Sequence, residues 1–251
     1  MPKQIGTGKI MGTIGDITFY KSRDGLMVKQ KSEVSAKRIA TDPAYARTRE
    51  NNKEFGRACK TGKVIRTAFN SIIAQTADSR MVSRLVQAVM TAQRADSVSD
   101  RGERNIITGD ASLLERFDFN EGSPFSAVFK PPFLADFDRA TGEATVNVES
   151  FIPAKEINSP DGATHLKLFS ATAAINFEYD TFLKANATTE EIALGLEVVP
   201  AINLVQQLLP NAEDYLIIVL GVEFYQKFNG RFYPMNNGSS NAITVARVDM
   251  P

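Results

Sequence analysis

The glycine-rich stretch near the N-terminus is the first place where residue types and spacing suggest chemistry. Gly6-Thr7-Gly8-Lys9 superficially resembles a phosphate-binding loop. Such a loop requires a preceding strand and the spacing G-x-x-x-x-G-K-[ST], and the stretch has neither. We therefore interpret residues 1–12 as an extended arm whose glycines permit close approach to another backbone, and we expect no nucleotide or other cofactor.

One cysteine and one histidine restrict nucleophilic and metal chemistry. Cys59 falls on the apolar stripe of a predicted helix beside Arg57 and Lys60, where a packed core position is the expectation. His165 alternates in phase with Lys167 at the start of a predicted strand, which places it on the solvent face. The sequence has no second cysteine or histidine, so we predict no intrachain disulfide and no site that needs two imidazoles.

Carboxylates are frequent in the second half, and Asp136, Asp138 and Glu143 come closest to a cation site. Their spacing does not fit an EF-hand loop, which places ligands at alternate positions and closes with a glutamate. A solvated turn is the interpretation, so we predict no metal. Because none of these candidates forms a catalytic set, we predict that the protein is not an enzyme.

The charge distribution is the strongest compositional signal. Residues 1–110 contain 20 Lys and Arg against 11 Asp and Glu, whereas residues 111–251 contain 9 against 18. Residues 1–66 alone hold 15 basic and 6 acidic side chains. Such a division indicates contact with nucleic acid or an acidic surface, or docking of one end on the opposite end of the same or another copy.

A β-hairpin is predicted over residues 14–31, ahead of the other predicted elements. Ser22-Arg23-Asp24-Gly25 has Ser and Gly at the positions that type I turns prefer, and pairing around it places Phe19 opposite Val28. Ile17 and Leu26 then share one apolar face with this pair, while the other face is mostly polar. Because an isolated hairpin is marginal in water, we expect the apolar face to meet helices of the same chain or a sheet of a neighbour.

Three helices are predicted to follow the hairpin. The first begins at Thr41-Asp42, has Pro43 in its first turn and ends at Gly62. Its apolar stripe is Tyr45, Thr48, Asn52, Phe55 and Cys59, and its basic ridge is Arg49, Lys53, Arg57 and Lys60. A close helix contact or a break is expected at Gly56. The second and third helices cover residues 63–76 and 78–94, and a polar loop covers 95–109.

After residue 120, apolar stretches separated by turn signals such as Asn229-Gly230 and Asn237-Gly238 predict antiparallel strands. The predicted strands are 126–129, 144–151, 164–173, 175–182, 215–228, 231–233 and 242–248. They favour a two-sheet sandwich of immunoglobulin-like size, without the tryptophan and cysteine pair of true immunoglobulin domains. The sequence therefore predicts an α+β protein with a basic arm, hairpin and helical region at 1–120 and an acidic β-sandwich at 121–251.

Apolar runs are too short for a membrane helix, since the longest covers residues 216–222 and a span needs about 20 residues. The N-terminus lacks the apolar core of a signal peptide. We therefore expect a protein without a membrane span that is cytoplasmic as synthesised.

Two stretches of the N-terminal region carry a family resemblance. Gly-Thr-Ile-Gly-Asp-Ile-Thr-Phe-Tyr at residues 12–20 and Thr-Asp-Pro-Ala-Tyr-Ala-Arg-Thr-Arg-Glu-Asn at residues 41–51 resemble a family of bacterial proteins of unknown function. The resemblance covers about the first 65 residues. It implies that the hairpin and the capped helix belong together, and it carries no catalytic residues across.

Together these observations predict a non-enzymatic structural subunit that self-assembles into a filament, tube or phage-like particle. The basic arm and hairpin would dock on the acidic domain of a neighbour, so the expected partners are other copies of the chain. A nucleic-acid-binding protein using the basic region is the alternative, and a lectin-like or adhesin module remains a third class. The predicted interface residues are Ile14, Ile17, Phe19, Tyr20, Leu26, Val28, Lys29, Lys31, Arg49, Lys53, Arg57 and Lys60.

Overall fold

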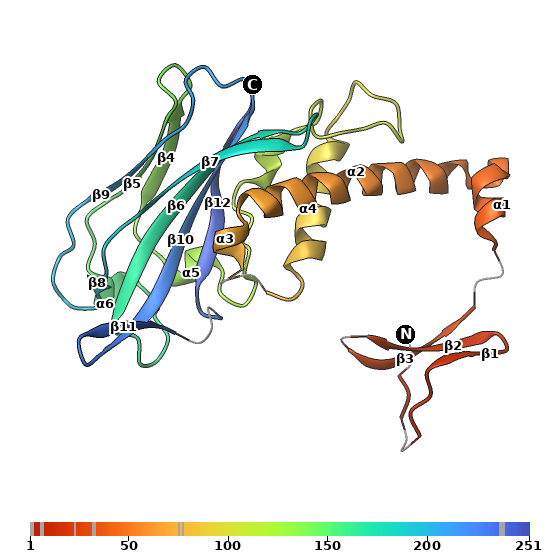
Figure 1. Cartoon of the computed structure of the whole chain (residues 1–251), viewed down its shortest axis with the longest axis horizontal. Coiled ribbons are helices and arrows are strands. Elements are labelled where there is room, and N and C mark those ends of the chain that lie inside the picture. The colour runs from red at the N-terminus through yellow and green to blue at the C-terminus, as the bar shows by residue number, and fades with distance from the viewer. Residues whose placement is uncertain are drawn as a thin grey trace. The chain divides into compact units, whose positions relative to one another are not determined.

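The computed structural model divides the chain into two compact units, residues 1–50 and residues 51–251, which we call the N-terminal unit and the C-terminal unit. It describes residues 3–5, 8–22, 24–31, 34–74, 76, 78–235 and 239–251. The predictions that involve Gly6-Thr7, Arg23 and Asn237-Gly238 therefore fall outside the described residues. Each unit is treated separately below, and Figure 1 shows the elements of both.

The N-terminal unit contains a three-stranded antiparallel sheet in the order β1-β2-β3, formed by β1 (Gly12–Ile14), β2 (Ile17–Ser22) and β3 (Gly25–Gln30). Phe19 pairs with Val28 and Lys21 with Leu26, so the predicted hairpin register is confirmed. The register follows from the period of two in a strand, because a slip by one residue would split the apolar residues between the faces.

The N-terminal arm returns to its own sheet. Lys3 bridges Met27, and the backbone N–H of Gln4 donates to the carbonyl of Leu26 at 2.9 Å, which covers the outer edge of β3. Met27 is buried, although it lies on the face that the sequence predicted to be polar. The prediction of a mostly polar face stays a prediction, and alternation alone does not reveal that Met27 is buried there.

The first helical region begins as predicted and ends differently. After α1 (Ala36–Thr41), the Asp42 side chain caps η1 (Pro43–Tyr45) by accepting from the N–H of Ala44 at 2.9 Å, which confirms the predicted cap. Helix α2 (Ala46–Ala68) then continues through Gly62 instead of stopping there. A Cβ at Gly62 would lie 3.6 Å from Val86, so this glycine serves a close helix contact, whereas Gly56 faces open space.

The predicted apolar stripe of this helix is also wrong. Phe55 is 54% exposed, and the buried side of α2 consists of Glu54, Ala58, Gly62, Val64, Ile65 and Ala68. The packing partner of the buried side is α4 (Met81–Arg94), whose predicted face is buried at Met81, Leu85, Val86 and Val89. The short helix α3 (Asn70–Ile73) lies between α2 and α4 in sequence, and η2 (Ala111–Leu114) follows α4.

Two antiparallel sheets complete the C-terminal unit, which confirms the α+β class. The larger has the path β11-β10-β6-β7, with β12 also on β10 and β8 on β6, and the smaller has the order β4-β5-β9. The larger comprises β6 (His165–Asn176), β7 (Thr181–Thr188), β8 (Ile192–Ala193), β10 (Tyr215–Phe228), β11 (Arg231–Pro234) and β12 (Ala242–Asp249). The smaller comprises β4 (Phe133–Asp138), β5 (Glu143–Val148) and β9 (Ile202–Gln207), and α6 (Pro153–Glu156) lies between β5 and β6.

The larger sheet is the middle layer of three. Helices α2 and α4 cover one face and the β4-β5-β9 sheet lies on the other (Figure 1). Phe169 and Ile217 point to the helices, while Leu168 and Ile218 point to the smaller sheet. Because both faces are covered, residues 215–222 of β10 are buried without interruption, which explains why their sequence lacks alternation.

Several predicted element bounds differ from the structure. Residues 126–129, predicted as a strand, belong mainly to the helical turn α5 (Phe125–Val128), and the strand predicted over 175–182 is divided by a turn between β6 and β7. Strands β4 and β9 were not anticipated. The domain boundary predicted at residue 120 stays a prediction, while the contacts divide the chain after Glu50 because helices α2 and α4 share a core with the larger sheet.

Candidate assembly surface

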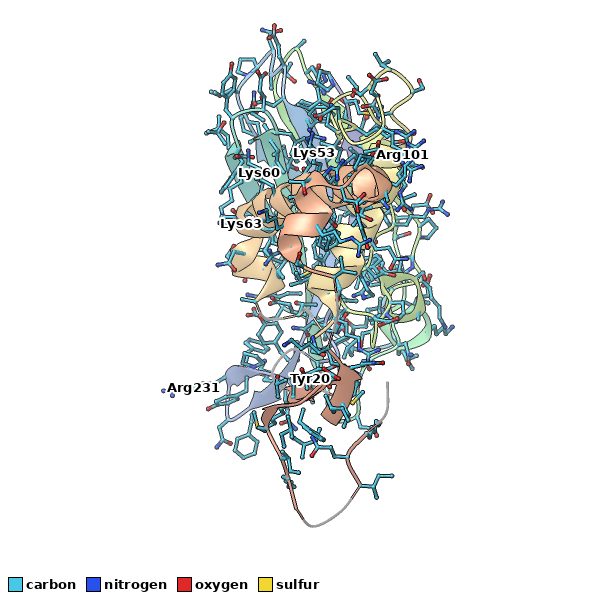
Figure 2. The ribbon with its side chains drawn as sticks, turned by 90° about the vertical axis from the view of Figure 1, so that its right-hand side faces the viewer. Tyr20, Lys53, Lys60, Lys63, Arg101 and Arg231 are labelled. Carbon is cyan, nitrogen blue, oxygen red and sulfur yellow. The ribbon has the colours of Figure 1, made fainter. Side chains whose placement is uncertain are left out.

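The basic ridge of α2 meets an acidic partner inside the C-terminal unit. Lys53 forms an ion pair with Glu103 at 2.9 Å, and Arg57 bonds the other oxygen of the same carboxylate. Arg57 also donates to the carbonyl of Gly102 at 2.6 Å. Hydrogen bonds and charge from both cations lower the pKa of Glu103, so the group stays charged. Lys53 and Lys60 lie along α2 in Figure 2.

The remaining ridge cations also bond within the chain. Lys60 forms an ion pair with Asp180 at 2.7 Å, in the turn between β6 and β7. Within the N-terminal unit, Arg49 donates to the carbonyls of Ile39 and Asp42 at 2.8 and 2.9 Å. Intrachain bonds thus account for all four predicted ridge residues, and their use in an interface stays a prediction.

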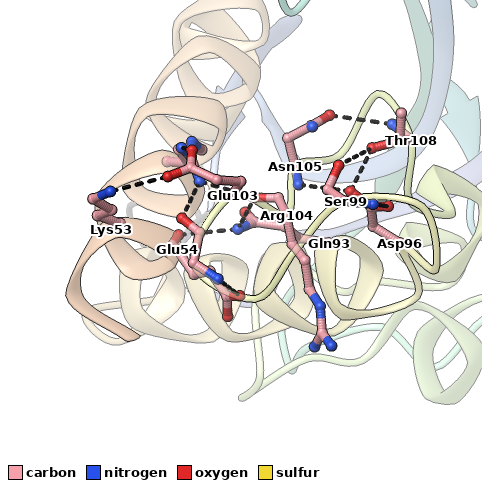
Figure 3. Close-up of polar contacts among 11 residues, drawn as sticks. Lys53, Glu54, Gln93, Asp96, Ser99, Glu103, Arg104, Asn105 and Thr108 are labelled. Carbon is pink, nitrogen blue, oxygen red and sulfur yellow. Dashed lines mark hydrogen bonds and ion pairs between the residues drawn. The ribbon is translucent and has the colours of Figure 1, made fainter. Parts of the chain in front are cut away.

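Residues 96–108 form a polar loop, shown in Figure 3. Glu103 attaches the loop to Lys53 and Arg57 of α2, and Arg104 attaches it to Gln93 of α4. Asp96 accepts hydrogen bonds from the N–H groups of Val98, Ser99 and Asn105 and from the hydroxyl of Thr108. Burial alone would raise the pKa of Asp96, but these hydrogen bonds outweigh it and lower the pKa. The loop itself thus engages the Asp96 carboxylate, while α2 engages Glu103, and we call this hydrogen-bonded network the brace.

Buried Glu54 and Gln93 complete this brace. Glu54 accepts from the N–H of Gly102 at 2.8 Å, and Gln93 donates to the carbonyls of Glu54 and Arg104 at 3.2 and 2.6 Å. Both side chains are almost inaccessible to solvent. Their bonds satisfy backbone groups of a loop that has no helix or strand of its own, which such buried groups require.

The apolar residues of the N-terminal unit are distributed differently. Ile5 is 98% exposed, and the exposed fractions of Ile10, Met11, Ile14 and Ile17 are 44%, 67%, 61% and 45%. Ile14 and Ile17 are cross-strand partners, so their side chains lie on the same face of the sheet. A concentration of exposed large apolar side chains is typical of an interaction surface.

The other predicted hairpin residues surround these isoleucines. Phe19, Leu26 and Val28 are half-buried on the same face as Ile17. On the opposite face, the ammonium of Lys29 lies 5.5 Å from the ring centre of Tyr20. Lys31 is exposed and its N–H donates to the carbonyl of Asp16 at 2.6 Å. The sheet thus brings the predicted hairpin residues together, while the ridge residues serve contacts of α1 and α2.

The residues considered for nucleophilic or metal chemistry take part in packing or in local hydrogen bonds. Cys59 is half-buried and packs against the helix-side core. His165 is also half-buried and meets the ring of Phe232 edge-on with centres 4.9 Å apart, and burial lowers the pKa of the imidazole. Asp138 bonds Thr141 and the N–H of Ala140 within its turn. Among the described residues, no group of three or more His, Cys, Asp or Glu side chains is arranged to hold a metal.

Sequence reasoning missed two surfaces of the β4-β5-β9 sheet. On its outer face Leu134 is 64% and Val205 46% exposed, beside the exposed carboxylates of Asp136, Asp138 and Glu143. The alternation in Phe-Leu-Ala-Asp-Phe-Asp, residues 133–138, is the signal that would have found β4.

The second surface is a groove of about 960 Å³ between β4 and β12, lined partly by the aromatic rings of Phe125, Phe129 and Phe133. Its polar edges are already bonded, because Arg247 reaches the carboxylate of Asp136 at 2.9 Å and the carbonyl of Ala135 at 3.3 Å. Glu115 accepts from the N–H of Val248 at 3.0 Å. These bonds occupy groups that an added strand would need.

Comparison with known proteins adds one distant likeness. No protein-family model matches the chain, and no curated protein matches it significantly. One solved structure, described as "pH-induced modulation of Streptococcus parasanguinis adhesion by Fap1 fimbriae", is similar over 48% of this chain and 83% of its own, with 14% identity and a TM-score of 0.24. A likeness at that TM-score carries no argument about function. Among the helices of the described residues, none has the length and hydrophobicity needed to cross a membrane.

Proposed function

We propose that the chain is a non-enzymatic structural subunit that associates with other copies of itself through its N-terminal unit. The observation that carries this proposal is the exposure of five large apolar side chains in the N-terminal unit, namely Ile5, Ile10, Met11, Ile14 and Ile17, of which Ile14 and Ile17 share one sheet face. Removing apolar surface from water is worth roughly 25 cal/mol per Å², so covering these side chains favours association. Assembly in the cytoplasm belongs to the same proposal, and fractionation of cells tests it.

The proposal takes further support from charge. Residues 1–50 carry ten Lys and Arg against five Asp and Glu, whereas residues 51–251 carry 19 against 24. Opposite net charges on the two units favour contact between the N-terminal unit of one copy and the C-terminal unit of another, and they disfavour contact between like units. Contacts of this kind are heterologous and build open filaments unless the rotation between copies closes a ring.

Nucleic acid binding has weaker support. Its main sequence evidence was the ridge of Arg49, Lys53, Arg57 and Lys60, and all four cations have intrachain acceptors. Phosphate contacts would have to compete with these bonds. A filter-binding titration addresses this function directly, because a nucleic-acid-binding protein would retain DNA or RNA at low salt and release it steeply as salt rises.

Light scattering over a concentration series tests the proposed function. The full chain should show a mass that rises with concentration, and the double substitution Ile14→Thr with Ile17→Thr should lower it. Threonine keeps the β-branched shape that suits a strand and removes the apolar contact. Leu183→Thr, at a 50% exposed position of β7, is the matched control and should leave the mass unchanged. A wild-type mass that stays that of one chain at every concentration contradicts the proposal.

A further inference from the structure

From the arrangement of apolar and charged side chains on two sheet faces, we infer which surface receives the N-terminal unit. The inference is that the β1-β2-β3 sheet of one copy packs face to face on the outer face of the β4-β5-β9 sheet of a second copy. It rests on the proposed function and adds the receiving surface.

The two faces match in size and strand number. Each sheet has three antiparallel strands, and the strands of the β4-β5-β9 sheet have six residues each, as do β2 and β3. Packed sheets lie roughly 10 Å apart with side chains of both faces in contact. Neither face needs to open for this contact, because the residues concerned already point outward.

The order of side chains along the two faces is complementary. On the receiving face Leu134 lies at one end in a row with Asn147 and Asn203. The middle row is Asp136, Thr145 and Val205, and the row at the other end is Asp138, Glu143 and Gln207. On the N-terminal sheet Ile14 and Ile17 lie at one end, Phe19 and Val28 follow, and Lys21 lies at the other end. One alignment therefore places Ile14 and Ile17 on the row of Leu134, Phe19 and Val28 on the row of Val205, and Lys21 on the two carboxylates.

The charges of the receiving face support this partner. Strands β4, β5 and β9 contain Asp136, Asp138 and Glu143 and no Lys, Arg or His. Arg247 already pairs with Asp136, which leaves the carboxylates at the end of the sheet for Lys21. Hydrogen bonds from Thr141 and Ala140 lower the pKa of Asp138, so its charge persists at neutral pH.

The size of the contact sets the expected strength. A face of three six-residue strands measures about 14 by 20 Å, which is small beside the roughly 800 Å² that each partner buries in a standard stable interface. Single contacts are therefore weak, with dissociation constants above about 1 μM. The exposed residues Ile5, Ile10 and Met11 add apolar area at the margin.

Sedimentation velocity of full-length variants tests the receiving face. Leu134→Lys with Val205→Lys should weaken association at least tenfold, while Leu183→Lys, the control on β7, should not change it. Circular dichroism and thermal unfolding verify that each variant is folded. The variant with Ile14→Thr and Ile17→Thr lacks the donor face, so mixing it with the Leu134→Lys/Val205→Lys variant should restore a one-to-one complex from two chains that are each monomeric.

A charge exchange tests the alignment. Lys21→Glu and Glu143→Lys should each weaken association several-fold, and the double variant should recover most of the loss, because the pair is then reversed.

If the Ile14→Thr/Ile17→Thr variant is monomeric while Leu134→Lys/Val205→Lys associates like the wild type, the receiving face is wrong and the proposed function stands. If both variants associate like the wild type, or if the wild type never associates, the proposed function is wrong and this inference is wrong with it.

Discussion

The two units of the chain bury their apolar side chains to very different extents. In the C-terminal unit, Leu216, Val219 and Leu220 of β10 have no exposed surface, because helices cover one face of the sheet and a second sheet covers the other. Among the described residues of the N-terminal unit, Met27 is the buried large apolar side chain, and five others are at least 44% exposed.

The difference in burial implies a difference in stability between the two units. The C-terminal unit supplies its own core and stabilises itself, since burial of apolar surface is the dominant favourable contribution to folding. The N-terminal unit pairs its backbone within the sheet, while Ile5, Ile10, Met11, Ile14 and Ile17 stay exposed. A small three-stranded sheet with little burial is marginally stable, so the proposed partner would stabilise it by mass action.

Hydrogen exchange should reveal the largest effect. At a concentration where the chain is monomeric, amide protons of β10 between Leu216 and Leu220 should exchange at least about 1,000-fold more slowly than those of β2, because local opening free energies range from near zero to the global value. Mass spectrometry of peptic fragments measures both segments in one experiment. Equal protection of β2 and β10 would remove the contrast between the units.

A substitution at Gly221 should break the C-terminal core. A Cβ at Gly221 would lie 2.1 Å from a ring carbon of Phe169, its cross-strand partner. Gly221→Val should therefore lower the free energy of unfolding by about 3 kcal/mol, as overpacked cores do. Urea denaturation measures the loss.

Two further variants control this experiment. Gly56→Ala, at a helical glycine with open space around it, should instead stabilise the protein by up to about 1 kcal/mol. Adding Phe169→Ala to Gly221→Val makes room for the new side chain, so the double variant should lose less than the sum of the single losses. An unchanged midpoint for Gly221→Val contradicts the packing of this pair.

The brace formed by residues 96–108 should contribute a smaller, pH-dependent amount. Asp96→Asn replaces a charged acceptor of four hydrogen bonds and should cost about 2 kcal/mol at pH 7. Because folding lowers the pKa of Asp96 from 3.8, its stabilising contribution is fully present above that pH and is lost as pH falls through the folded value. The difference between wild type and Asp96→Asn should therefore shrink below about pH 4 in urea titrations, and a constant difference contradicts the assignment.

Local pattern sufficed for some elements. The hairpin register followed from the alternation of Ile17, Phe19, Leu26 and Val28, and the cap at Asp42 followed from its position before Pro43. The bounds of β10 matched the predicted 215–228 because a single apolar run is limited by turn residues on both sides. In each case the signal lies within one strand, one hairpin or one helical turn.

Other features depended on partners distant in sequence. The ridge of Lys53 and Arg57 has the residue types of a nucleic-acid surface, but both side chains bind Glu103, which is 50 residues from Lys53. Gly62 resembled a helix stop, yet it lies against Val86 of α4. The outer face of the smaller sheet depends on the pairing of β4, β5 and β9, which come from separate parts of the sequence.

The α+β class, the one-sided hairpin and the opposite charges of the two ends follow from periodicity and composition, which are properties of the sequence. Tertiary structure alone decided which of those charges and apolar side chains are used within the chain. Lys53, Arg57 and Lys60 of the basic ridge form ion pairs within the chain, while Ile14 and Ile17 stay exposed. The physical reason is that burial and pairing depend on contacts between segments far apart in sequence, which local residue spacing does not encode.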